Sequence, residues 1–226
     1  MTAAGAQTQP SILPAILGAD PLAYGAALDA VAAAGCEWMH VDVMDGQFTG
    51  EISFGHRLVV ALAGAGRAAV DVHLQTAAPL DDVGTFVGAG ARRLALHVEA
   101  VDDPLRAIEA IRSAGAHASL AVNPETPLPP DSVLAELDAL LLMTCPPGTS
   151  DYDARVLAKI TDARERLTAL GSAAPIVADG GIKLANAAEV AEAGASELVA
   201  ASAVFAHPDG PQRGVAELLK AARRGG

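Results

Sequence analysis

Short apolar runs alternate with longer Ala-rich stretches along the whole chain. The apolar runs have the length and composition of buried strands, and the Ala-rich stretches carry charged residues at helical spacing. We predict strands over residues 12–17, 38–43, 69–74, 93–98, 118–122, 139–143, 176–178 and 198–201. We predict helices over residues 21–34, 57–65, 80–87, 104–114, 154–170, 187–193 and 215–223. The elements therefore alternate as β-α units.

Residues with known positional preferences stand at the ends of the predicted helices. Asp20, Asp103 and Asn186 precede helical stretches and are expected to act as N-caps. Glycines follow several helical stretches, where a left-handed C-terminal residue is usual, at Gly35, Gly90, Gly115, Gly171 and Gly194. These positions support the predicted boundaries.

The repeated β-α units predict a (β/α)8 TIM barrel, because eight of them fit a chain of 226 residues. An open doubly wound sheet is the alternative, since alternation alone does not establish closure. The dinucleotide fingerprint G-x-G-x-x-G is absent after the first predicted strand. We expect a flexible tail at residues 1–10 and a single barrel domain at residues 11–226.

Polar side chains gather at the ends of several predicted strands, where a barrel places its chemistry. Strand periodicity puts His40 and Asp42 on one face, and His73 and Asp179 end two other strands. Two imidazoles and two carboxylates form a donor set for Zn²⁺, with Fe²⁺, Mn²⁺ or Co²⁺ as alternatives. Each residue taken alone has a simpler explanation, since a histidine at a strand end is often structural and Asp-Gly often forms a turn.

Other histidines suggest less. His97 and Glu99 end the fourth predicted strand and are equally consistent with a catalytic role and with a structural role or support of the site. His56, His117 and His207 fall at presumed helix starts or in loops and are expected at the surface.

Composition excludes several classes of function. The formal net charge is −12 and the basic residues form no stripe, which argues against nucleic-acid binding. Mean hydropathy is +0.33, yet no apolar run has the length of a membrane span. The N-terminal ten residues lack the features of a signal peptide. Two cysteines, Cys36 and Cys145, fit a reducing cytoplasm.

The chain resembles the ribulose-phosphate 3-epimerase family in five segments that follow one another in order: HVDVMDGQF, DVHL, HVEA, NPETPL and ADGGI. The resemblance implies a TIM barrel and an isomerase that interconverts D-ribulose 5-phosphate and D-xylulose 5-phosphate in the pentose phosphate pathway. It implies one divalent metal ion per subunit, zinc being favoured, with His40, Asp42, His73 and Asp179 as its ligands. A cytoplasmic homo-oligomer that acts on a small sugar phosphate, with no nucleic-acid or membrane partner, is expected.

The resemblance also implies a division of roles within the site. Asp42 and Asp179 correspond to the acid/base pair, each serving one epimer by proton transfer through a metal-stabilised enediolate. Met44 and Met143 correspond to methionines that line the site with apolar surface. Positions near the substrate phosphate correspond to Gly148, Gly180, Gly181, Ala201 and Ser202.

Several positions depart from the family pattern, and most of them concern the substrate. Ala15 stands where the family has serine, Gln47 where it has histidine, and Gln75 where it has methionine. Ala201 replaces a glycine of strand eight. The glycine-rich loop after strand six reads PPGTSDY, so that Thr149, Ser150 and Asp151 follow Gly148. An aspartate facing a phosphate would be repelled, unless Asp151 points to solvent while Thr149 and Ser150 donate hydrogen bonds.

These departures leave two further hypotheses. The first keeps the epimerase chemistry and changes the substrate to a hexulose 6-phosphate or an unphosphorylated ketose. The second is a metal-binding barrel without catalysis that serves as a partner protein. Related barrel decarboxylases and formaldehyde-fixing synthases place a lysine among the acids after strand two, and Asp42-Val43-Met44-Asp45 contains none.

Overall fold

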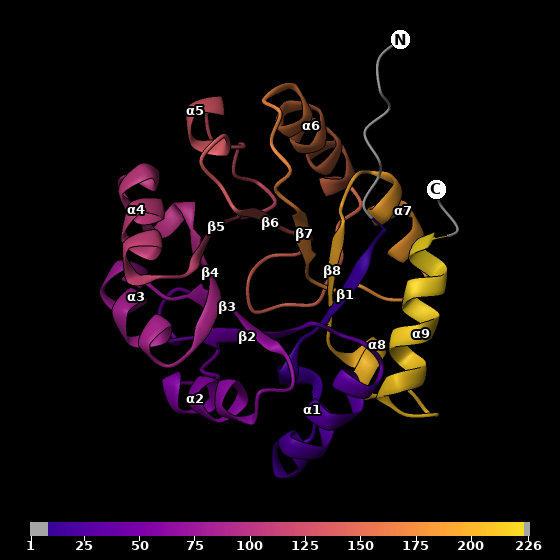
Figure 1. The fold of residues 1–226 in the computed structure, drawn as a ribbon. Coiled ribbons are helices and arrows are strands. Elements are labelled where there is room, and N and C mark those ends of the chain that lie inside the picture. Colours follow the sequence, from indigo (N-terminus) through magenta and orange to yellow (C-terminus); the bar gives the residue numbers. More distant parts are fainter. Residues whose placement is uncertain (1–8, 224–226) are drawn as a thin grey trace.

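The computed structural model describes residues 9–223, which form a ring of strands surrounded by helices (Figure 1). The strands are β1 (Ser11–Pro14), β2 (Trp38–Met44), β3 (Ala69–Gln75), β4 (Ala91–His97), β5 (His117–Val122), β6 (Ala139–Met143), β7 (Ile176–Asp179) and β8 (Glu197–Ala200). All neighbouring strands in this sheet run parallel. The predicted (β/α)8 barrel is therefore confirmed.

Closure of the ring distinguishes this fold from the doubly wound alternative. Hydrogen-bonded strands follow the order β1-β8-β7-β6-β5-β4-β3-β2, which leaves β1 and β2 at the two ends. A parallel bridge between Ala15 and His40 joins these ends just beyond β1. The contact that closes the barrel thus involves a residue of the candidate site.

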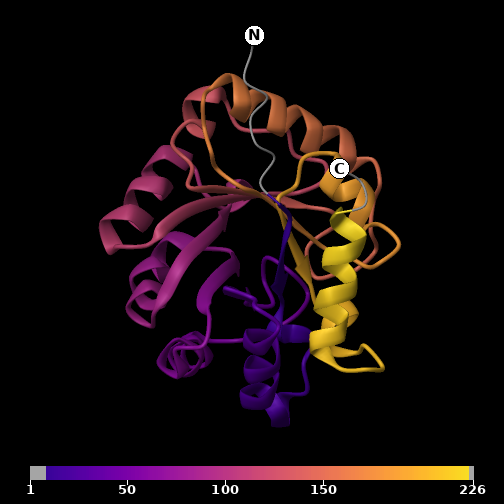
Figure 2. The same ribbon diagram turned by 45° about the vertical axis from the view of Figure 1, so that its right-hand side comes forward.

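Helices follow the strands and cover the outside of the barrel, as the turned view also shows (Figure 2). The longer ones are α1 (Tyr24–Ala33), α2 (His56–Ala65), α3 (Pro79–Gly88), α4 (Pro104–Ala114), α6 (Val156–Ala169) and α9 (Pro211–Ala222). The short ones are α5 (Asp131–Leu134), α7 (Ala187–Glu192), α8 (Ser202–Phe205) and the 3-10 turns η1 (Ile16–Gly18), η2 (Pro21–Ala23) and η3 (Val98–Ala100). Helix α9 lies beside β1, so the two ends of the barrel domain are close together.

The sequence located most elements correctly and misjudged some of their ends. The first predicted strand, residues 12–17, is wrong at its C-terminal end, because β1 stops at Pro14 and the chain turns through η1. The predicted helix over residues 21–34 divides into η2 and α1, and α9 begins at Pro211, four residues before the predicted start. Helices α5 and α8 were not predicted, since each spans a single turn.

The predicted caps are mostly confirmed. The carboxylate of Asp20 accepts a hydrogen bond from the backbone of Leu22, and Asp103 accepts two at the start of α4. The five predicted C-cap glycines all have positive φ. Asn186 is the exception, because its side chain turns back into the loop after β7, accepting from the Lys183 N–H and donating to the Gly181 carbonyl.

The core has two layers, because alternate residues of each strand face opposite sides. Val41 and Val43 of β2 point outward into the large apolar layer between sheet and helices. A smaller apolar cluster fills the barrel interior with residues such as Leu13, Leu141 and Val177. The barrel interior also contains buried polar residues from β2, β3 and β4.

The predicted N-terminal tail, residues 1–10, lies outside the described residues for most of its length, and β1 begins at Ser11. The assignment of residues 11–226 to one domain stays a prediction. Within residues 9–223, no helix combines the length and the apolar character needed to cross a membrane.

Candidate metal centre and substrate cavity

The pairing of β2 with β3 positions the polar side chains of the barrel interior. Residues directly opposite one another are His40 and Asp71, then Asp42 and His73, then Met44 and Gln75. Every second residue of each strand faces inward, so the two strands present these side chains at the same three levels, and Met44 is the one apolar side chain among them. These levels run toward the C-terminal ends of the strands, where barrel enzymes carry their sites.

The middle of this arrangement is a cluster of two imidazoles and two carboxylates. Ligand atoms of the four residues all lie within 4.8 Å of one another, and the cluster comprises His40, Asp42, His73 and Asp179. Asp42 Oδ1 lies 3.2 Å from His40 Nε2 and 3.3 Å from His73 Nδ1. Asp179 Oδ2 lies 3.5 Å and 3.1 Å from the same two nitrogens. The structure therefore brings together the four residues that the sequence singled out.

A buried network of ion pairs holds the ring of His40 on the side away from the cluster. His40 Nδ1 lies 2.7 Å from Asp71 Oδ2, and the other oxygen of Asp71 accepts from Arg93 Nε at 2.7 Å. Arg93 also pairs with Glu197 of β8 at 2.7 Å and lies over the ring of Trp38. Because a carboxylate only accepts hydrogen bonds, Nδ1 of His40 carries a proton toward Asp71, and Nε2, which faces the cluster, is the nitrogen that could bind a metal.

A second chain of hydrogen bonds holds the ring of His73. His73 Nε2 lies 2.9 Å from His97 Nε2, and His97 Nδ1 lies 3.0 Å from Glu99 Oε2. Glu99 also accepts from the backbone N–H of Asn123. His97 and Glu99, which the sequence left between two roles, thus support a residue of the cluster from the side away from the carboxylates.

The centre attracts positive charge. Burial alone lowers the pKa of His40, but the carboxylates of Asp42, Asp179 and Asp71 outweigh it and raise that pKa well above its usual range. Burial likewise opposes ionisation of Asp42 and Asp179, yet the imidazoles keep the pKa of each carboxyl below its usual range. Burial lowers the pKa of His97 to about 4, so that ring is neutral at pH 7.

These residues fit a divalent cation. Four buried donors face a common point, and the partners of both rings direct one lone pair from each imidazole toward it. Mixed nitrogen and oxygen donors in this number suit Zn²⁺ and its neighbours in the first transition row. The metal itself is selected by availability as well as by donors, so the geometry supports a divalent site rather than one element.

A cavity of about 420 Å³ opens above the cluster. Asp42 and Asp179 lie in its wall, so the carboxylates are accessible from the cavity. All seven residues that the sequence predicted to contact substrate line it: Met44, Met143, Gly148, Gly180, Gly181, Ala201 and Ser202. The cavity lining thus contains every predicted contact and both predicted bases.

Two adjacent glycines after β7 permit a close approach of the chain. At Gly180, with φ of +122°, a Cβ would lie 2.3 Å from the sulfur of Cys145. At Gly181, with φ of +65°, it would lie 2.6 Å from the carbonyl oxygen of Ser150. Any larger residue would push the loop after β6 away from the loop after β7. These glycines therefore shape one end of the cavity.

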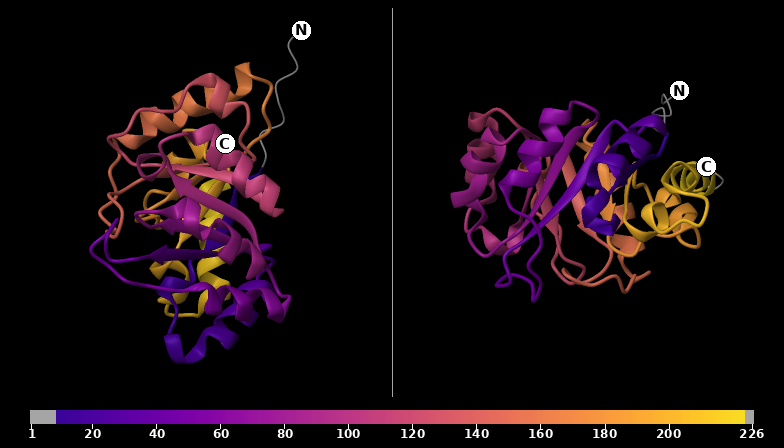
Figure 3. Two further views of the ribbon diagram at one scale, coloured as in Figure 1. Left: turned by 90° about the vertical axis from the view of Figure 1, so that its left-hand side faces the viewer. Right: turned by 90° about the horizontal axis from the view of Figure 1, so that it is seen from below.

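The loop after β6 also meets the loop after β2 at the cavity mouth, and both extend from the same end of the barrel (Figure 3). A Cβ at Gly148 would lie 3.3 Å from Thr49 Cβ and 3.9 Å from Glu51 Cγ. The hydroxyl of Thr149 donates to the Pro146 carbonyl within its own loop. Ser150 lines the cavity, whereas Asp151 is exposed and lies outside the lining.

Charge in the cavity lining is uneven. Lys183 is the one basic side chain among the described residues that line it, alongside the acids Asp42, Glu51 and Asp179. Lys183 follows Gly181 by two residues, and Asn186 fixes its backbone. Lys183 is exposed and belongs to the same loop as Gly180 and Gly181, so it stands at the edge of the cavity.

The positions that depart from the family pattern fall in different places. Ala15 and Gln75 line the cavity, and Gln47 is exposed. Among the histidines expected at the surface, His56 and His117 are exposed. His207 is partly buried and lies 3.3 Å from Glu217.

Sequence reasoning missed the residues that hold the centre in place. Asp71 was visible as an inward-facing residue two positions before His73, and strand period would have identified it as a neighbour of His40. Arg93 and Glu197 gave no such signal, because their contact crosses the barrel interior between β4 and β8. Gln75 was noted only as a departure, whereas its amide lies 3.0 Å from Asp42 Oδ1.

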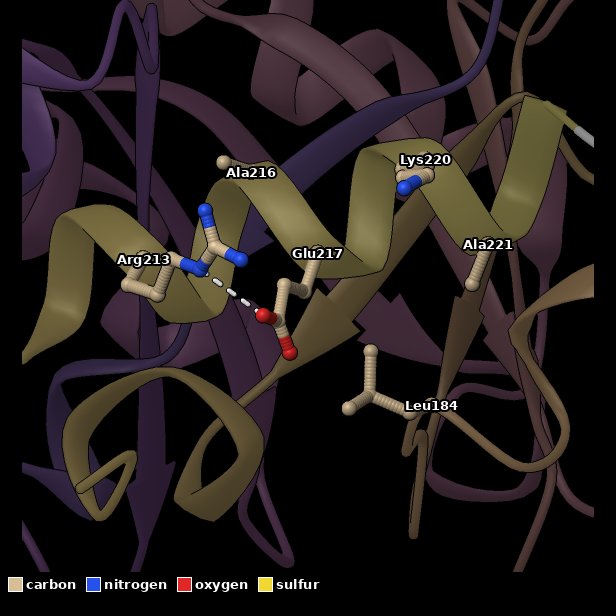
Figure 4. Close-up of a pocket in the computed structure, with 6 residues that line it drawn as sticks. All are labelled: Leu184, Arg213, Ala216, Glu217, Lys220 and Ala221. Carbon is tan, nitrogen blue, oxygen red and sulfur yellow. Dashed lines mark hydrogen bonds and ion pairs between the residues drawn. The ribbon is translucent and has the colours of Figure 1, made fainter. Parts of the chain in front are cut away.

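A second cavity of about 420 Å³ lies on the outside of the barrel, where α9 passes the loop after β7 (Figure 4). Arg213 and Glu217 form a 2.7 Å ion pair along α9, and Leu184 faces them from the loop. Lys220 stands one turn further along the helix. This groove contains none of the residues of the metal cluster.

Comparison with known sequences agrees with the geometry. Residues 11–205 match the model of the ribulose-phosphate 3 epimerase family. The chain is 39% identical over 203 residues to the chloroplastic ribulose-5-phosphate-3-epimerase of Arabidopsis thaliana, covering 88% of this chain and 72% of that protein. It is 38% identical to the ribulose-phosphate 3-epimerase of Synechocystis, with 88% of both covered. The Escherichia coli ribulose-phosphate 3-epimerase is 36% identical, with 88% and 90% covered.

Solved structures with low sequence identity share the fold. A thiamine phosphate pyrophosphorylase from Pyrococcus furiosus superposes with a TM-score of 0.60 at 18% identity, covering 96% of this chain and 97% of its own. A 3-hexulose-6-phosphate synthase from Salmonella typhimurium reaches 0.65 at 15% identity, covering 96% and 100%. These similarities support the barrel architecture.

Proposed function

This chain belongs to the ribulose-phosphate 3-epimerase family, and we propose that it is a metal-dependent isomerase that interconverts D-ribulose 5-phosphate and D-xylulose 5-phosphate. The observation that carries the proposal is the pair of carboxylates, Asp42 and Asp179, that face one cavity from different strands and share two imidazole neighbours. Epimerisation beside a ketone requires a proton to leave one face of the carbon and another to arrive on the opposite face.

The two carboxylates carry out these transfers. One of them, ionised, accepts the proton from C3 while the other, protonated, donates to the opposite face, and the roles reverse for the return reaction. Asp42 serves one epimer and Asp179 the other. Each acid ends the reaction in the protonation state in which its partner began, and exchange with solvent resets the pair.

His40, Asp42, His73 and Asp179 hold the metal ion, for which we propose zinc. A divalent cation bound there supplies positive charge that stabilises the negative charge developing on the substrate oxygens as C3 loses its proton. Asp71 and His97 keep the two imidazoles oriented toward it. Met44 and Met143 offer a wall without hydrogen-bonding groups on the cavity side, which limits the access of water to the carbanionic carbon.

The phosphate of the substrate binds at the other end of the cavity. Gly180, Gly181, Ala201 and Ser202 line this end, and Gly148 approaches it from the loop after β6. Lys183 supplies the positive charge that a phosphate dianion requires in a cavity otherwise lined by acids. The exposed position of Asp151 keeps its charge away from the phosphate.

The biological setting follows from the same reaction. We propose that the protein acts in the pentose phosphate pathway, in the cytoplasm and as a homo-oligomer. Its two cysteines, Cys36 and Cys145, are buried free thiols, which suits a reducing compartment. Burial raises the pKa of both thiols to about 11.

Proton exchange tests this function directly. Metal-loaded protein is incubated with D-ribulose 5-phosphate in heavy water and followed by NMR. Deuterium at C3 together with D-xylulose 5-phosphate is the expected result. Absence of exchange with this substrate, combined with exchange of a hexulose 6-phosphate or an unphosphorylated ketose, would overturn the choice of substrate. Stoichiometric metal binding without exchange of any ketose would overturn the assignment as an enzyme.

A further inference from the structure

Gln75 places an amide against one of the two proposed bases. Its side chain comes from the last residue of β3, and the residue is 3% exposed. Gln75 Nε2 donates to Asp42 Oδ1 at 3.0 Å. Because an ionised carboxylate has no proton to give, the NH2 end of the amide is the end that must face Asp42.

The hydrogen bond selects one oxygen of Asp42. Oδ1 is also the oxygen that faces both imidazoles, at 3.2 Å from His40 Nε2 and 3.3 Å from His73 Nδ1. Oδ1 is thus the oxygen directed at the metal position, and a donor fixed to it restricts rotation of the carboxylate. The second oxygen is then left for the cavity.

The two bases differ in this respect. Among the residues that the structure describes, the side-chain oxygens of Asp179 form hydrogen bonds and ion pairs with the imidazoles of the cluster and with no other side chain. Asp42 has the same imidazole contacts and the amide in addition. The amide therefore holds the carboxylate of Asp42 in one orientation, and Asp179 has no corresponding donor.

The other end of the amide shows that this contact comes at a cost. Gln75 Oε1 is buried and has no hydrogen-bond partner among the described residues. A buried acceptor without a partner destabilises the folded protein, and an apolar side chain at this position would remove the penalty. The single satisfied end is the one that reaches Asp42, which indicates a role for the residue beyond packing.

We propose that Gln75 is a positioning residue for Asp42. Its amide holds Oδ1 of Asp42 toward the metal and thereby leaves Oδ2 of Asp42 facing C3 of the substrate. The residue acts through Asp42 and distinguishes it from Asp179. The part of this inference that concerns C3 rests on the proposed function, whereas the part that concerns orientation at the metal does not.

Two substitutions separate the hydrogen bond from packing. Gln75→Met has a similar length and no donor, and Gln75→Leu is another apolar side chain of similar size without a donor. Gln212→Met, on the exposed face of α9, is the matched control. Unfolding midpoints measured in urea establish that each variant is folded before the metal and the reaction are examined.

Metal binding gives the first readout, which does not depend on turnover. Competition with a chelator should show affinity for Zn²⁺ about tenfold weaker in both Gln75 variants and unchanged in Gln212→Met, as is usual when a group that orients a metal ligand is lost. The visible spectrum of the Co²⁺-loaded protein should change in the Gln75 variants, because a different orientation of the Asp42 carboxylate changes the ligand field at the metal.

Isotope partitioning gives the second readout. Starting from each epimer in heavy water, deuterium is measured separately in the product and in the remaining substrate. The ratio should change in both Gln75 variants for the epimer whose proton Asp42 removes, and should stay constant for the other epimer. If Gln75 had only a structural role, the deuterium ratio would change for both epimers or for neither.

Unchanged Zn²⁺ affinity and an unchanged Co²⁺ spectrum in both Gln75 variants would overturn the inference. An equal change of partitioning in both directions would overturn the distinction between the two bases. If the wild-type protein exchanges no ketose, the proposed function fails while the metal measurements still decide whether Gln75 positions Asp42.

Discussion

His73 and His97 face one another through their Nε2 atoms at 2.9 Å, and this contact determines which nitrogen of His73 is free for a metal. Glu99 accepts a hydrogen bond from the Nδ1–H of His97. The pKa of His97 is low, about 4, so its ring is neutral at pH 7. His97 Nε2 is therefore an acceptor, and His73 must donate to it from Nε2. Nδ1 of His73, which faces both carboxylates, is therefore the nitrogen that could bind a metal.

Replacement of His97 tests this arrangement. His97→Leu removes the acceptor, so the ring of His73 loses the partner that fixes its tautomer. We expect Zn²⁺ affinity, measured by competition with a chelator, to fall by about 10- to 100-fold. His56→Leu, at an exposed histidine, should bind zinc as the wild type does. Equal affinities for the His97 variant and the wild type would show that His73 needs no such partner.

Asp42→Asn keeps the size of the side chain and removes its basicity. We expect exchange of the C3 proton with solvent to fall on the order of 10²- to 10⁴-fold at saturating metal, while the urea unfolding transition stays cooperative. NMR in heavy water measures the exchange, and metal content is determined on the same sample. Retained turnover in a metal-loaded variant would show that another group is the base.

Lys183→Met tests the phosphate end of the cavity. Loss of one positive charge near a dianion should reduce kcat/KM about tenfold, chiefly through KM, and should weaken inhibition by inorganic phosphate in parallel. Lys220→Met is the matched control, because Lys220 lies in the outer groove on α9 (Figure 4). If the two variants behave alike, the phosphate is held by backbone groups without help from Lys183.

Arg93→Met should destabilise the fold. The guanidinium is buried between Asp71 and Glu197, and its removal leaves both carboxylates without their cation in the barrel interior. We expect a loss of about 3–5 kcal/mol in the free energy of unfolding, measured in urea at pH 7 on metal-free protein. Arg67→Met, whose ion pair with Asp29 is largely exposed, should cost less than about 1 kcal/mol. Equal losses would show that the buried network around Arg93 contributes no more to stability than an exposed ion pair.

Glu99 should contribute to the pH dependence of stability. Burial opposes its ionisation, but hydrogen bonds from His97, Thr126 and Asn123 lower the pKa of its carboxyl from 4.5 to about 2. A depressed pKa stabilises the fold above the unfolded value of 4.5, and the contribution is lost as pH falls toward 2. Between pH 5 and pH 3, metal-free wild type should lose about 2 kcal/mol more unfolding free energy than Glu99→Gln. Equal losses in urea titrations would contradict the shift.

Local properties of the chain were enough to predict the barrel and the cluster. The rhythm of apolar and Ala-rich stretches reports which residues can be buried, and strand period places His40 beside Asp42 on one face. Parallel strands bring their C-terminal ends to one rim, so His73 and Asp179 were expected near the same point. The short turns α5 and α8 escaped prediction, because a single helical turn has no period to detect.

The sequence by itself thus determined the order of elements, the inward face of each strand and the four donors of the candidate metal centre. Only the tertiary structure decided that Ala15 and His40 close the ring, that Arg93 reaches Glu197 across the interior, and that the Gln75 amide faces Asp42. The physical reason is that side-chain period is a property of a few consecutive residues. Register, closure and contacts across the barrel depend on the packing of all eight strands at once.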